Sequence, residues 1–436
     1  MGDARKAALT VLEKCRRSGA WSDAVSGSVM DDAQLSGPDR ALASALSYGV
    51  LQNRMLLDDL IEKHSSLPLR RIEPKVLDIL RIGAFQLLMM DRIPPSAAVN
   101  SAVQLTKELG FGRATAFVNA VLRRLSGTDI ELPVSCDPES LSLRWSHPRW
   151  LTELYLRLLG PEEAEMLLRA DNSPAPLTLQ TNTLQIDSET LLSALKSLGL
   201  NCRSHPFVPD CILLDGGNVR ELDLFRKGAF YVQDAAAKLS VLAAAPVKGN
   251  RILDVCAAPG GKTFAASILS GGAEIIACDL HENKLRRIAD GITRLGLNQI
   301  ELKALDARTF YPEFEAGFDL VIADVPCSGL GVIRKKPDIR YKNPDDFAAL
   351  PAIQSAIMRN VSRYVNPNGT LLYSTCTIRP EENGEVCAAF LNENKEFSYE
   401  DFSLPDGSKS SSGMLQLWPQ RNGTDGFFIA KFRKWM

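Results

Sequence analysis

Two cysteines stand in unusual local settings, each directly after an apolar run that predicts a β-strand. Cys327 lies in "ADVPCSG" and Cys376 in "YSTCTIRPEEN", and both are flanked by proline, serine or threonine instead of aliphatic core residues. A thiol in such a place has four ordinary uses: core packing, metal binding, a disulfide or nucleophilic attack. A thiolate is nucleophilic enough to form a covalent intermediate with its substrate.

The remaining cysteines help to choose among these uses. The chain has nine cysteines, an odd number, and no two of them form a CxxC pair. Zinc ligands usually come in such pairs, so we predict no metal site. The N-terminus lacks the apolar segment of a secretory signal, so we expect a cytoplasmic protein, in which disulfides are disfavoured. For Cys256, Cys278 and Cys387 we predict core packing, which leaves nucleophilic chemistry for Cys327 and Cys376.

A glycine-bearing loop follows another predicted strand and precedes a predicted helix. In "LDVCAAPGGKT", Gly260 and Gly261 let backbone amides approach a ligand at the helix N-terminus. A Walker A loop would need a glycine where Cys256 stands, and the G-x-G-x-x-G pattern of dinucleotide-binding proteins is missing as well. The loop therefore predicts a cofactor site of another kind.

Four aspartates come at the ends of successive predicted strands: Asp254, Asp279, Asp306 and Asp324. One aspartate in such a place is most often a turn or cap residue. Asp279, however, lies about twenty residues beyond the loop, where an acid bonds ribose hydroxyls, and Asp306 ends the next strand, where it can meet an adenine amine. The series favours a nucleoside cofactor, and a methyl donor such as S-adenosylmethionine suits it.

The elements that must position these residues follow from the apolar pattern. From about residue 236 onward, short apolar runs alternate with helical stretches, which predicts a parallel sheet with crossover helices and ligands at the strand C-termini. The last run, "DGFFIAKFRK", predicts an extra edge strand. Residues 136–235 predict a linker and a small mixed α/β unit, and residues 1–135 show the three-four apolar spacing of helices throughout.

Charge and hydropathy limit the possible partners. The net charge is −2 and the sequence pI is near 6.2, so any nucleic-acid site must be a local patch. No apolar run approaches the ~18 residues that span a bilayer, so we expect no membrane association. Four basic residues follow Cys327: Arg334, Lys335, Lys336 and Arg340. A charge run is usually a solvated face, but beside a base pocket it can hold phosphates, with Tyr341 stacking on an unpaired base.

Three motifs together resemble the RNA (cytosine-5) methyltransferase family: "DVCAAPGGKT", "DVPCSGLGVIRKKPD" and "YSTCTIRPEEN". The helical N-terminus, ending in "FVNAVLRR", resembles the NusB-like domain of the bacterial Sun/Fmu branch, the ribosomal RNA small subunit methyltransferase B type. The resemblance covers nearly the whole chain. It implies an α/β fold with three parts: an all-α NusB-like RNA-binding domain (1–135), a linker with a small α/β subdomain (136–235), and a Rossmann-like class I methyltransferase domain that uses S-adenosylmethionine (236–436).

The resemblance also implies residue roles. A thiolate that adds to carbon 6 of cytosine makes carbon 5 able to take a methyl group, and an acid at ring nitrogen 3, such as Asp324, assists. The residues alone leave open which cysteine attacks; the resemblance implies that Cys376 is the nucleophile and that Cys327 assists product release. The implied cofactor contacts are Cys256, Ala257, Ala258, Pro259, Gly260, Gly261, Lys262, Asp279, Asp306 and Asp324. The chain departs from the family pattern at Val325, where alanine is frequent, and at Tyr341, where tryptophan is common.

The expected substrate is a cytosine of 16S (small-subunit) ribosomal RNA, single-stranded or flipped out of its helix. We expect the protein to act as a monomer. Two alternatives remain at this point: a non-catalytic, antitermination-like RNA-binding factor built on the NusB-like domain, and the same chemistry on transfer RNA.

Overall fold

The computed structural model describes residues 3–18 and 22–435. The chain forms two compact units. The first comprises Met1–Ser173 together with Ile333–Lys342, and the second comprises Pro174–Val332 together with Asn343–Met436. Among the described residues, none of the helices has the length and apolar character that crossing a membrane requires.

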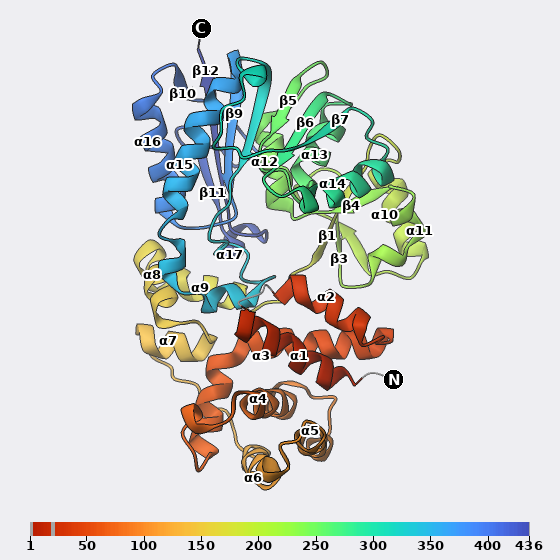
Figure 1. Cartoon of the computed structure of the whole chain (residues 1–436), viewed down its shortest axis with the longest axis vertical. Coiled ribbons are helices and arrows are strands. Elements are labelled where there is room, and N and C mark those ends of the chain that lie inside the picture. Colours follow the sequence, from red (N-terminus) through yellow and green to blue (C-terminus); the bar gives the residue numbers. More distant parts are fainter. Residues whose placement is uncertain (1–2, 19–21, 436) are drawn as a thin grey trace. The chain divides into compact units, whose positions relative to one another are not determined.

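The described part of the first unit is helical (Figure 1). Its α-helices are α1 (Ala4–Ser18), α2 (Ser22–Asp32), α3 (Gly37–His64), α4 (Pro74–Met89), α5 (Pro95–Glu108), α6 (Thr115–Leu125), α7 (Pro138–Trp145), α8 (Arg149–Leu159) and α9 (Pro161–Asp171). In α4, Val76, Ile79 and Leu80 form the buried stripe that the three-four spacing predicts. Helices α3 and α4 approach so closely that a Cβ on Gly49 would lie 2.0 Å from Cζ of Phe85.

The second unit begins with a small antiparallel sheet in the order β2-β3-β1-β4. Its elements are β1 (Leu177–Thr181), α10 (Ser188–Ser197), β2 (Cys202–Ser204), β3 (Cys211–Leu214), α11 (Asp223–Arg226) and β4 (Phe230–Val232). Leu179, Ile212 and Phe230 are buried in a core that Leu191 and Leu195 of α10 complete. The small α/β unit predicted from the sequence is therefore present.

A larger, eight-stranded sheet occupies the rest of the described second unit, in the order β10-β12-β9-β8-β5-β6-β7, with β11 paired to β12. Its strands are β5 (Arg251–Asp254), β6 (Glu274–Asp279), β7 (Ile300–Ala304), β8 (Phe318–Asp324), β9 (Val365–Thr375), β10 (Phe397–Tyr399), β11 (Met414–Leu417) and β12 (Phe427–Lys434). The strands from β9 to β7 are parallel. The chain moves outward from β5 through β6 and β7, then returns to place β8 and β9 on the other side of β5, so the topological switch point lies between β5 and β8.

Strand β12 differs from its prediction as an edge strand. It lies antiparallel between β9 and β10, and β11 also pairs with it. Its residues Phe428 to Phe432 are buried. The apolar run therefore reflects an interior position, and the edge prediction was wrong.

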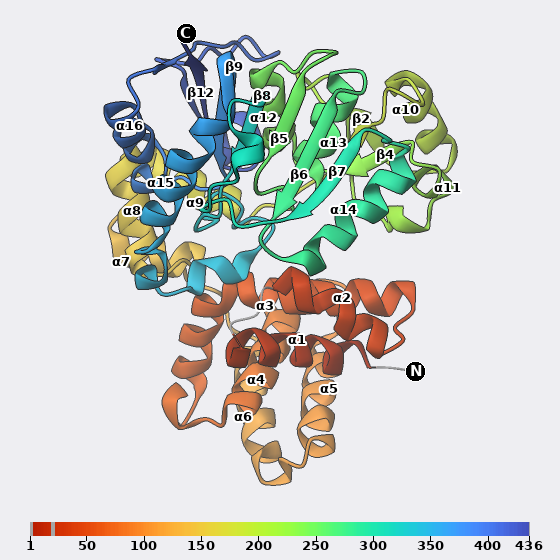
Figure 2. The same ribbon diagram turned by 45° about the horizontal axis from the view of Figure 1, so that its top comes forward.

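Helices cover both faces of this sheet (Figure 2). They are α12 (Ala235–Ala244), α13 (Gly261–Leu269), α14 (Glu282–Leu295), α15 (Leu350–Val361) and α16 (Gly384–Glu393); a short helix, α17 (Pro419–Asn422), precedes β12. The first three pack on the face that presents Ile252, and α15 and α16 pack on the face that presents Leu253. Neighbouring residues of a strand point to opposite faces, so a strand buried on both sides is apolar throughout. The predicted parallel sheet with crossover helices is confirmed.

Candidate active site

The loop between β5 and α13 carries the predicted cofactor residues, and its glycines are required by close contacts. Gly260 has φ +107°, and a Cβ there would lie 2.6 Å from Cζ of Phe264. A Cβ on Gly261 would lie 2.7 Å from Nε2 of Gln233. A side chain is strained at Gly260 because of its φ, and at Gly261 it would have to displace the Gln233 side chain; the loop leads directly into the N-terminus of α13. A helix N-terminus with unhindered backbone amides is a favourable place for a polar or anionic ligand.

Two predicted cofactor carboxylates lie at the ends of the adjacent strands β6 and β7. Asp279 accepts backbone hydrogen bonds from Ala258 (3.3 Å) and His281 (3.0 Å), so it fixes the glycine-bearing loop from the neighbouring strand. Asp306 is paired with Arg308 at 2.7 Å, and this hydrogen bond lowers the pKa of the Asp306 carboxyl. A loop at a helix N-terminus with carboxylates on the next two strands fits a nucleoside cofactor with ribose and adenine donors.

Lys262 and Asp324 form an ion pair at the carboxyl end of β8. The Lys262 ammonium donates to Oδ2 of Asp324 at 2.6 Å, and the Ser374 hydroxyl donates to Oδ1 at 2.8 Å. The Lys262 side chain is 9% exposed and that of Asp324 is 29% exposed. The pair joins the cofactor loop to the strand that leads to Cys327, which places Lys262 beside the predicted catalytic residues as well as in the cofactor loop.

The structure brings the two predicted catalytic thiols together. The sulfur atoms of Cys327 and Cys376 are 3.3 Å apart. Asp324 of β8 lies opposite Ser374 of the parallel neighbour β9, and Cys327 and Cys376 follow these residues by three and two positions, respectively. The hydrogen bond with Cys376, burial and nearby negative charge, including that of Glu382, raise the pKa of the Cys327 thiol well above its usual value. Cys327 is therefore a thiol at neutral pH.

Three further cysteines, Cys256, Cys278 and Cys387, have the packing roles that the sequence predicts. Cys278 and Cys387 are fully buried in the apolar core, and Cys256 packs against the same cluster. Burial raises the pKa of each of these thiols. The nine cysteines, which all lie in the described part of the chain, form no disulfide with one another. No group of three or more histidine, cysteine, aspartate or glutamate side chains with metal-binding geometry occurs within residues 3–18 and 22–435.

The basic segment after Cys327 belongs to the helical first unit. Arg340 is fully buried there, and its guanidinium donates to the carbonyl oxygens of Gln52 (3.0 Å) and Ser146 (3.2 Å) and to Oδ1 of Asn172 (2.9 Å). These bonds occupy the side chain that was predicted to hold RNA phosphates. Arg340 therefore anchors the segment within its unit, and its predicted RNA contact does not fit this structure.

Tyr341, the predicted stacking residue, also has a partner within the first unit. The guanidinium of Arg54 lies over its ring, 3.5 Å from the ring centroid. Arg334, Lys335 and Lys336 have partly exposed side chains. The RNA contacts predicted for these three residues stay a prediction.

Several polar residues around the thiols were not identified from the sequence. Three of them, Ser374, Glu382 and Asn383, belong to the motif "YSTCTIRPEEN", and the fourth is Gln354 of α15. All four side chains are buried. The first three could have been found from the sequence, because they lie in the motif that contains Cys376. Gln354 gave no signal, because a single polar residue in an amphipathic helix is ordinarily exposed.

The buried carboxyl of Asp254, at the end of β5, should make the free energy of unfolding depend on pH. Burial raises its pKa to about 7 from an ordinary value of 3.8, although the Thr263 hydroxyl donates to it at 2.7 Å. Between those two values the folded chain holds a proton that the unfolded chain has released, so stability falls as pH rises through this window. Asp254→Asn removes this titration. The free energy of unfolding of the variant minus that of wild type should therefore increase by on the order of 1–3 kcal/mol between about pH 5 and about pH 8. Denaturant unfolding of both proteins at the two pH values measures this; an equal difference at both would contradict it.

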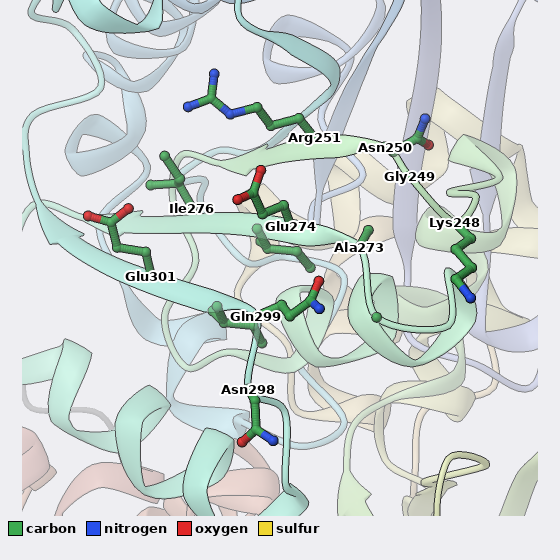
Figure 3. A pocket seen from close by; sticks show the side chains of 13 residues that line it. Lys248, Gly249, Asn250, Arg251, Ala273, Glu274, Ile276, Asn298, Gln299 and Glu301 are labelled. Atoms are coloured by element: carbon green, nitrogen blue, oxygen red, sulfur yellow. The ribbon is translucent and has the colours of Figure 1, made fainter.

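A hollow of about 710 Å³ lies at the opposite ends of the central strands. Figure 3 shows its lining, which includes Arg251 and Glu274 at the starts of β5 and β6 and Asn298 just before β7. The aspartates described above, Cys327 and Cys376 lie at or beyond the carboxyl ends of the strands. This hollow is therefore not part of the candidate active site.

Comparisons with known proteins agree with this organisation. Residues 241–433 match the family described as 16S rRNA methyltransferase RsmB/F, residues 2–126 match the NusB family, and residues 147–220 match the ferredoxin-like domain of RsmF/B-like methyltransferases. The chain is 35% identical to the probable ribosomal RNA small subunit methyltransferase B of Bacillus subtilis (strain 168), over 99% of this chain and 98% of that protein. It is 34% identical to the ribosomal RNA small subunit methyltransferase B of Klebsiella pneumoniae (strain 342), over 92% and 91%.

A solved structure, that of PH0851, shares the fold with a TM-score of 0.84 at 24% identity, over 99% of both chains. The predicted fold class is confirmed: a Rossmann-like methyltransferase core, an all-helical NusB-like domain, and a small α/β domain that comes between them in the sequence. The match over the full length of a probable ribosomal RNA methyltransferase also argues against the alternative of a non-catalytic RNA-binding factor. The chain belongs to the RsmB/F family of S-adenosylmethionine-dependent 16S rRNA methyltransferases.

Proposed function

We propose that this protein methylates carbon 5 of a cytosine in 16S ribosomal RNA through a covalent bond between Cys376 and the base. The observation that carries the proposal is the 3.3 Å separation of the Cys327 and Cys376 sulfur atoms beside Asp324. Carbon 5 of cytosine is a poor nucleophile, and addition of a thiolate to carbon 6 is the means of activating it. Other ribosomal RNA methylations, on exocyclic nitrogen or ribose oxygen, have no need for a pair of thiols.

In this proposal, the loop from Cys256 to Lys262, together with Asp279 and Asp306, holds S-adenosylmethionine. The cofactor supplies an electrophilic methyl group. The close packing at Gly260 and Gly261 keeps side chains away from the loop backbone. Asp279, which already fixes the loop through Ala258, has further lone pairs for ribose hydroxyls.

The protein's own residues then activate the base and release it. Cys376 releases its proton to water and adds to carbon 6 as a thiolate, and the electrons move to carbon 5, which takes the methyl group. Asp324 donates a hydrogen bond to ring nitrogen 3 as negative charge develops there, with the Lys262 ammonium, 2.6 Å away, as its proton source. After transfer, the carbon 5 proton passes to water and its electron pair forms the double bond between carbons 5 and 6. The bond from sulfur to carbon 6 breaks, the Cys327 thiol gives its proton to the departing sulfur, and the proton at nitrogen 3 returns through Asp324 to Lys262.

RNA binding in this proposal involves Arg334, Lys335 and Lys336, whose charges suit phosphate groups. The base must leave its stack to reach the thiols. The curated relatives are named for the small ribosomal subunit, and this favours 16S rRNA over transfer RNA as the substrate.

Asp324→Asn tests the part assigned to the acid. We expect methyl transfer in a single turnover to slow by roughly 10²–10⁴-fold, since this is the usual size of general acid catalysis. Asp345→Asn makes the same change at an exposed position of the second unit and should leave the rate unchanged. Affinity for S-adenosylmethionine is measured in parallel by calorimetry. A rate loss explained wholly by weaker cofactor binding would contradict the role at nitrogen 3.

The experiment that tests the function as a whole follows the labelled methyl group. Full-length protein is incubated with labelled S-adenosylmethionine and either unmodified 16S rRNA or unmodified transfer RNA, and each RNA is digested to nucleosides. We expect label in 5-methylcytidine from 16S rRNA only. Label in another nucleoside would overturn the carbon 5 assignment, and preferential labelling of transfer RNA would overturn the substrate.

A further inference from the structure

Two adjacent residues of the "RPEEN" segment, Glu382 and Asn383, are fully buried or nearly so, at 0% and 3% exposure, and the mechanism above gives them no part. A buried carboxylate is costly unless its oxygens accept hydrogen bonds. The partners of these two side chains therefore show what the burial achieves.

Glu382 holds the loop that contains Cys327. Its Oε2 accepts from the backbone N–H of Ser328 at 2.8 Å and from Nε2 of Gln354 at 3.0 Å. The same Gln354 amide donates to the carbonyl oxygen of Pro326 at 3.0 Å. The residues on both sides of Cys327 are thus held by one carboxylate and one amide.

Asn383 does the same for Cys376. Its Oδ1 accepts from the Thr375 hydroxyl at 2.6 Å, and its Nδ2 donates to the carbonyl oxygen of Thr377 at 3.0 Å. Asn383 stands at the N-cap position of α16, where asparagine commonly caps the helix, yet its side chain makes no capping bond. Its side chain instead bonds the two residues that flank Cys376, and its Nδ2 also donates to Oε1 of Gln416 in β11 at 3.1 Å.

The loop around Cys327 needs such partners because it has no regular structure of its own. Val325 to Gly329 lie outside any helix or strand. Backbone groups that are buried without ladder partners must find side chains instead. The two loops are joined as well by the Ser328 and Thr377 hydroxyls, which are 2.7 Å apart.

We propose that Glu382 and Asn383 are the positioning residues of the thiol pair: Glu382, through Gln354, sets the place of Cys327, and Asn383 sets the place of Cys376. Neither side chain touches the base. Loss of Glu382 should therefore impair the step assigned to Cys327, and loss of Asn383 should impair the step assigned to Cys376. The catalytic part of this inference rests on the proposed function, whereas its geometric part does not.

The geometric part is tested without RNA, by joining the two thiols. Hydrogen peroxide converts two thiols to one disulfide and yields two molecules of water, and two sulfurs 3.3 Å apart need little movement to reach bonding distance. Full-length wild type, Glu382→Ala, Asn383→Ala and the control Glu385→Gln are oxidised, and the Cys327–Cys376 disulfide is followed by peptide mass spectrometry. Glu385 is the control because it is a glutamate only three residues after Glu382, in α16, but is exposed.

We expect wild type and Glu385→Gln to form the disulfide at equal rates and the two alanine variants to form it at least tenfold more slowly. For Glu382→Ala, the direction of the change in oxidation rate distinguishes a positioning role from an effect of charge. Its negative charge helps to raise the pKa of the Cys327 thiol, so a role through charge alone would make oxidation faster in Glu382→Ala. Oxidation at or above the wild-type rate in both alanine variants would overturn the inference.

The catalytic part is tested with RNA in the same proteins, with Cys327→Ala beside them. Glu382→Ala should accumulate a covalent protein–RNA adduct on a denaturing gel, as is expected of Cys327→Ala, with a lower kcat and an unchanged KM for RNA. Asn383→Ala should form the adduct more slowly and not accumulate it. If Cys327→Ala accumulates adduct but Glu382→Ala does not, this inference fails. If Cys327→Ala itself gives no adduct, the proposed release step fails, and the disulfide test still judges the positioning.

Two further variants, Glu382→Gln and Gln354→Ala, test the inference if Glu382→Ala does not fold. Glu382→Gln keeps an acceptor for the Ser328 N–H but turns an amide toward the Arg379 guanidinium, which lies 3.3 Å from Glu382, so it should fall between wild type and alanine in both assays. Gln354→Ala keeps the carboxylate and frees the Pro326 carbonyl, and should slow the disulfide as well. Wild-type behaviour of both variants in both assays would contradict the inference.

Discussion

Replacing Cys376 with alanine is expected to abolish methyl transfer, with a loss of at least about 10⁴-fold in rate, as for other enzymes that lose their nucleophile. The reason is that carbon 5 stays unreactive when no sulfur adds to carbon 6. Because Cys376 is a small side chain at a partly exposed position, the variant should keep its fold and its affinity for S-adenosylmethionine. The measurement is methyl transfer to 16S rRNA in a single turnover, with circular dichroism and calorimetry on the same preparation.

Cys136→Ala is the matched control for this experiment, since it removes an exposed free thiol from the helical unit. It should methylate at the wild-type rate. Activity of Cys376→Ala within tenfold of wild type would show that Cys376 is not the nucleophile.

Cys327→Ala is expected to have the opposite effect on the covalent intermediate. The Cys327 sulfur is 3.3 Å from Cys376, and its raised pKa keeps it protonated and able to donate to the departing sulfur. Without that donor, breakdown of the adduct should slow more than its formation. A protein–RNA band that resists denaturant should therefore accumulate, and its fraction on a gel is the measurement.

The pair of variants also distinguishes the two possible assignments of the cysteines. If the roles were exchanged, Cys376→Ala would accumulate the adduct and Cys327→Ala would form none. The sulfur positions alone are nearly symmetrical, so this comparison tests the assignment independently of the geometry.

Much of the site could be predicted because parallel strands present their ends at one edge. Asp279, Asp324 and the two cysteines follow apolar runs in the sequence, and knowing that these runs are parallel strands is enough to bring their ends together. The glycines of the cofactor loop were likewise predictable, since Gly260 adopts a left-handed conformation that the strand-to-helix turn requires.

Other features depended on which elements become neighbours, which the local pattern does not determine. The β12 run looks like a terminal edge strand, but β10 and β11 pair with it and make it interior. Arg340 belongs to a basic run, but long-range contacts with Gln52 and Asn172 bury it. Burial of a charged side chain by partners far away in sequence leaves no periodic signal.

Glu382 and Asn383 could be predicted only in part from the sequence. Both lie in a motif whose thiol predicts chemistry, but the sequence does not show which polar neighbours of the thiol become buried. Their partners, Ser328 and Gln354 for Glu382 and Thr375 and Thr377 for Asn383, appear only when β8, β9 and α15 are assembled.

The central claim is a covalent bond between Cys376 and cytosine, and mapping that bond tests it most directly. The adduct of Cys327→Ala with 16S rRNA is digested with protease and ribonuclease, and the modified peptide is sequenced by mass spectrometry. The account predicts a cytidine nucleotide attached to Cys376. A nucleotide attached to any other residue, or to a base other than cytosine, would contradict it.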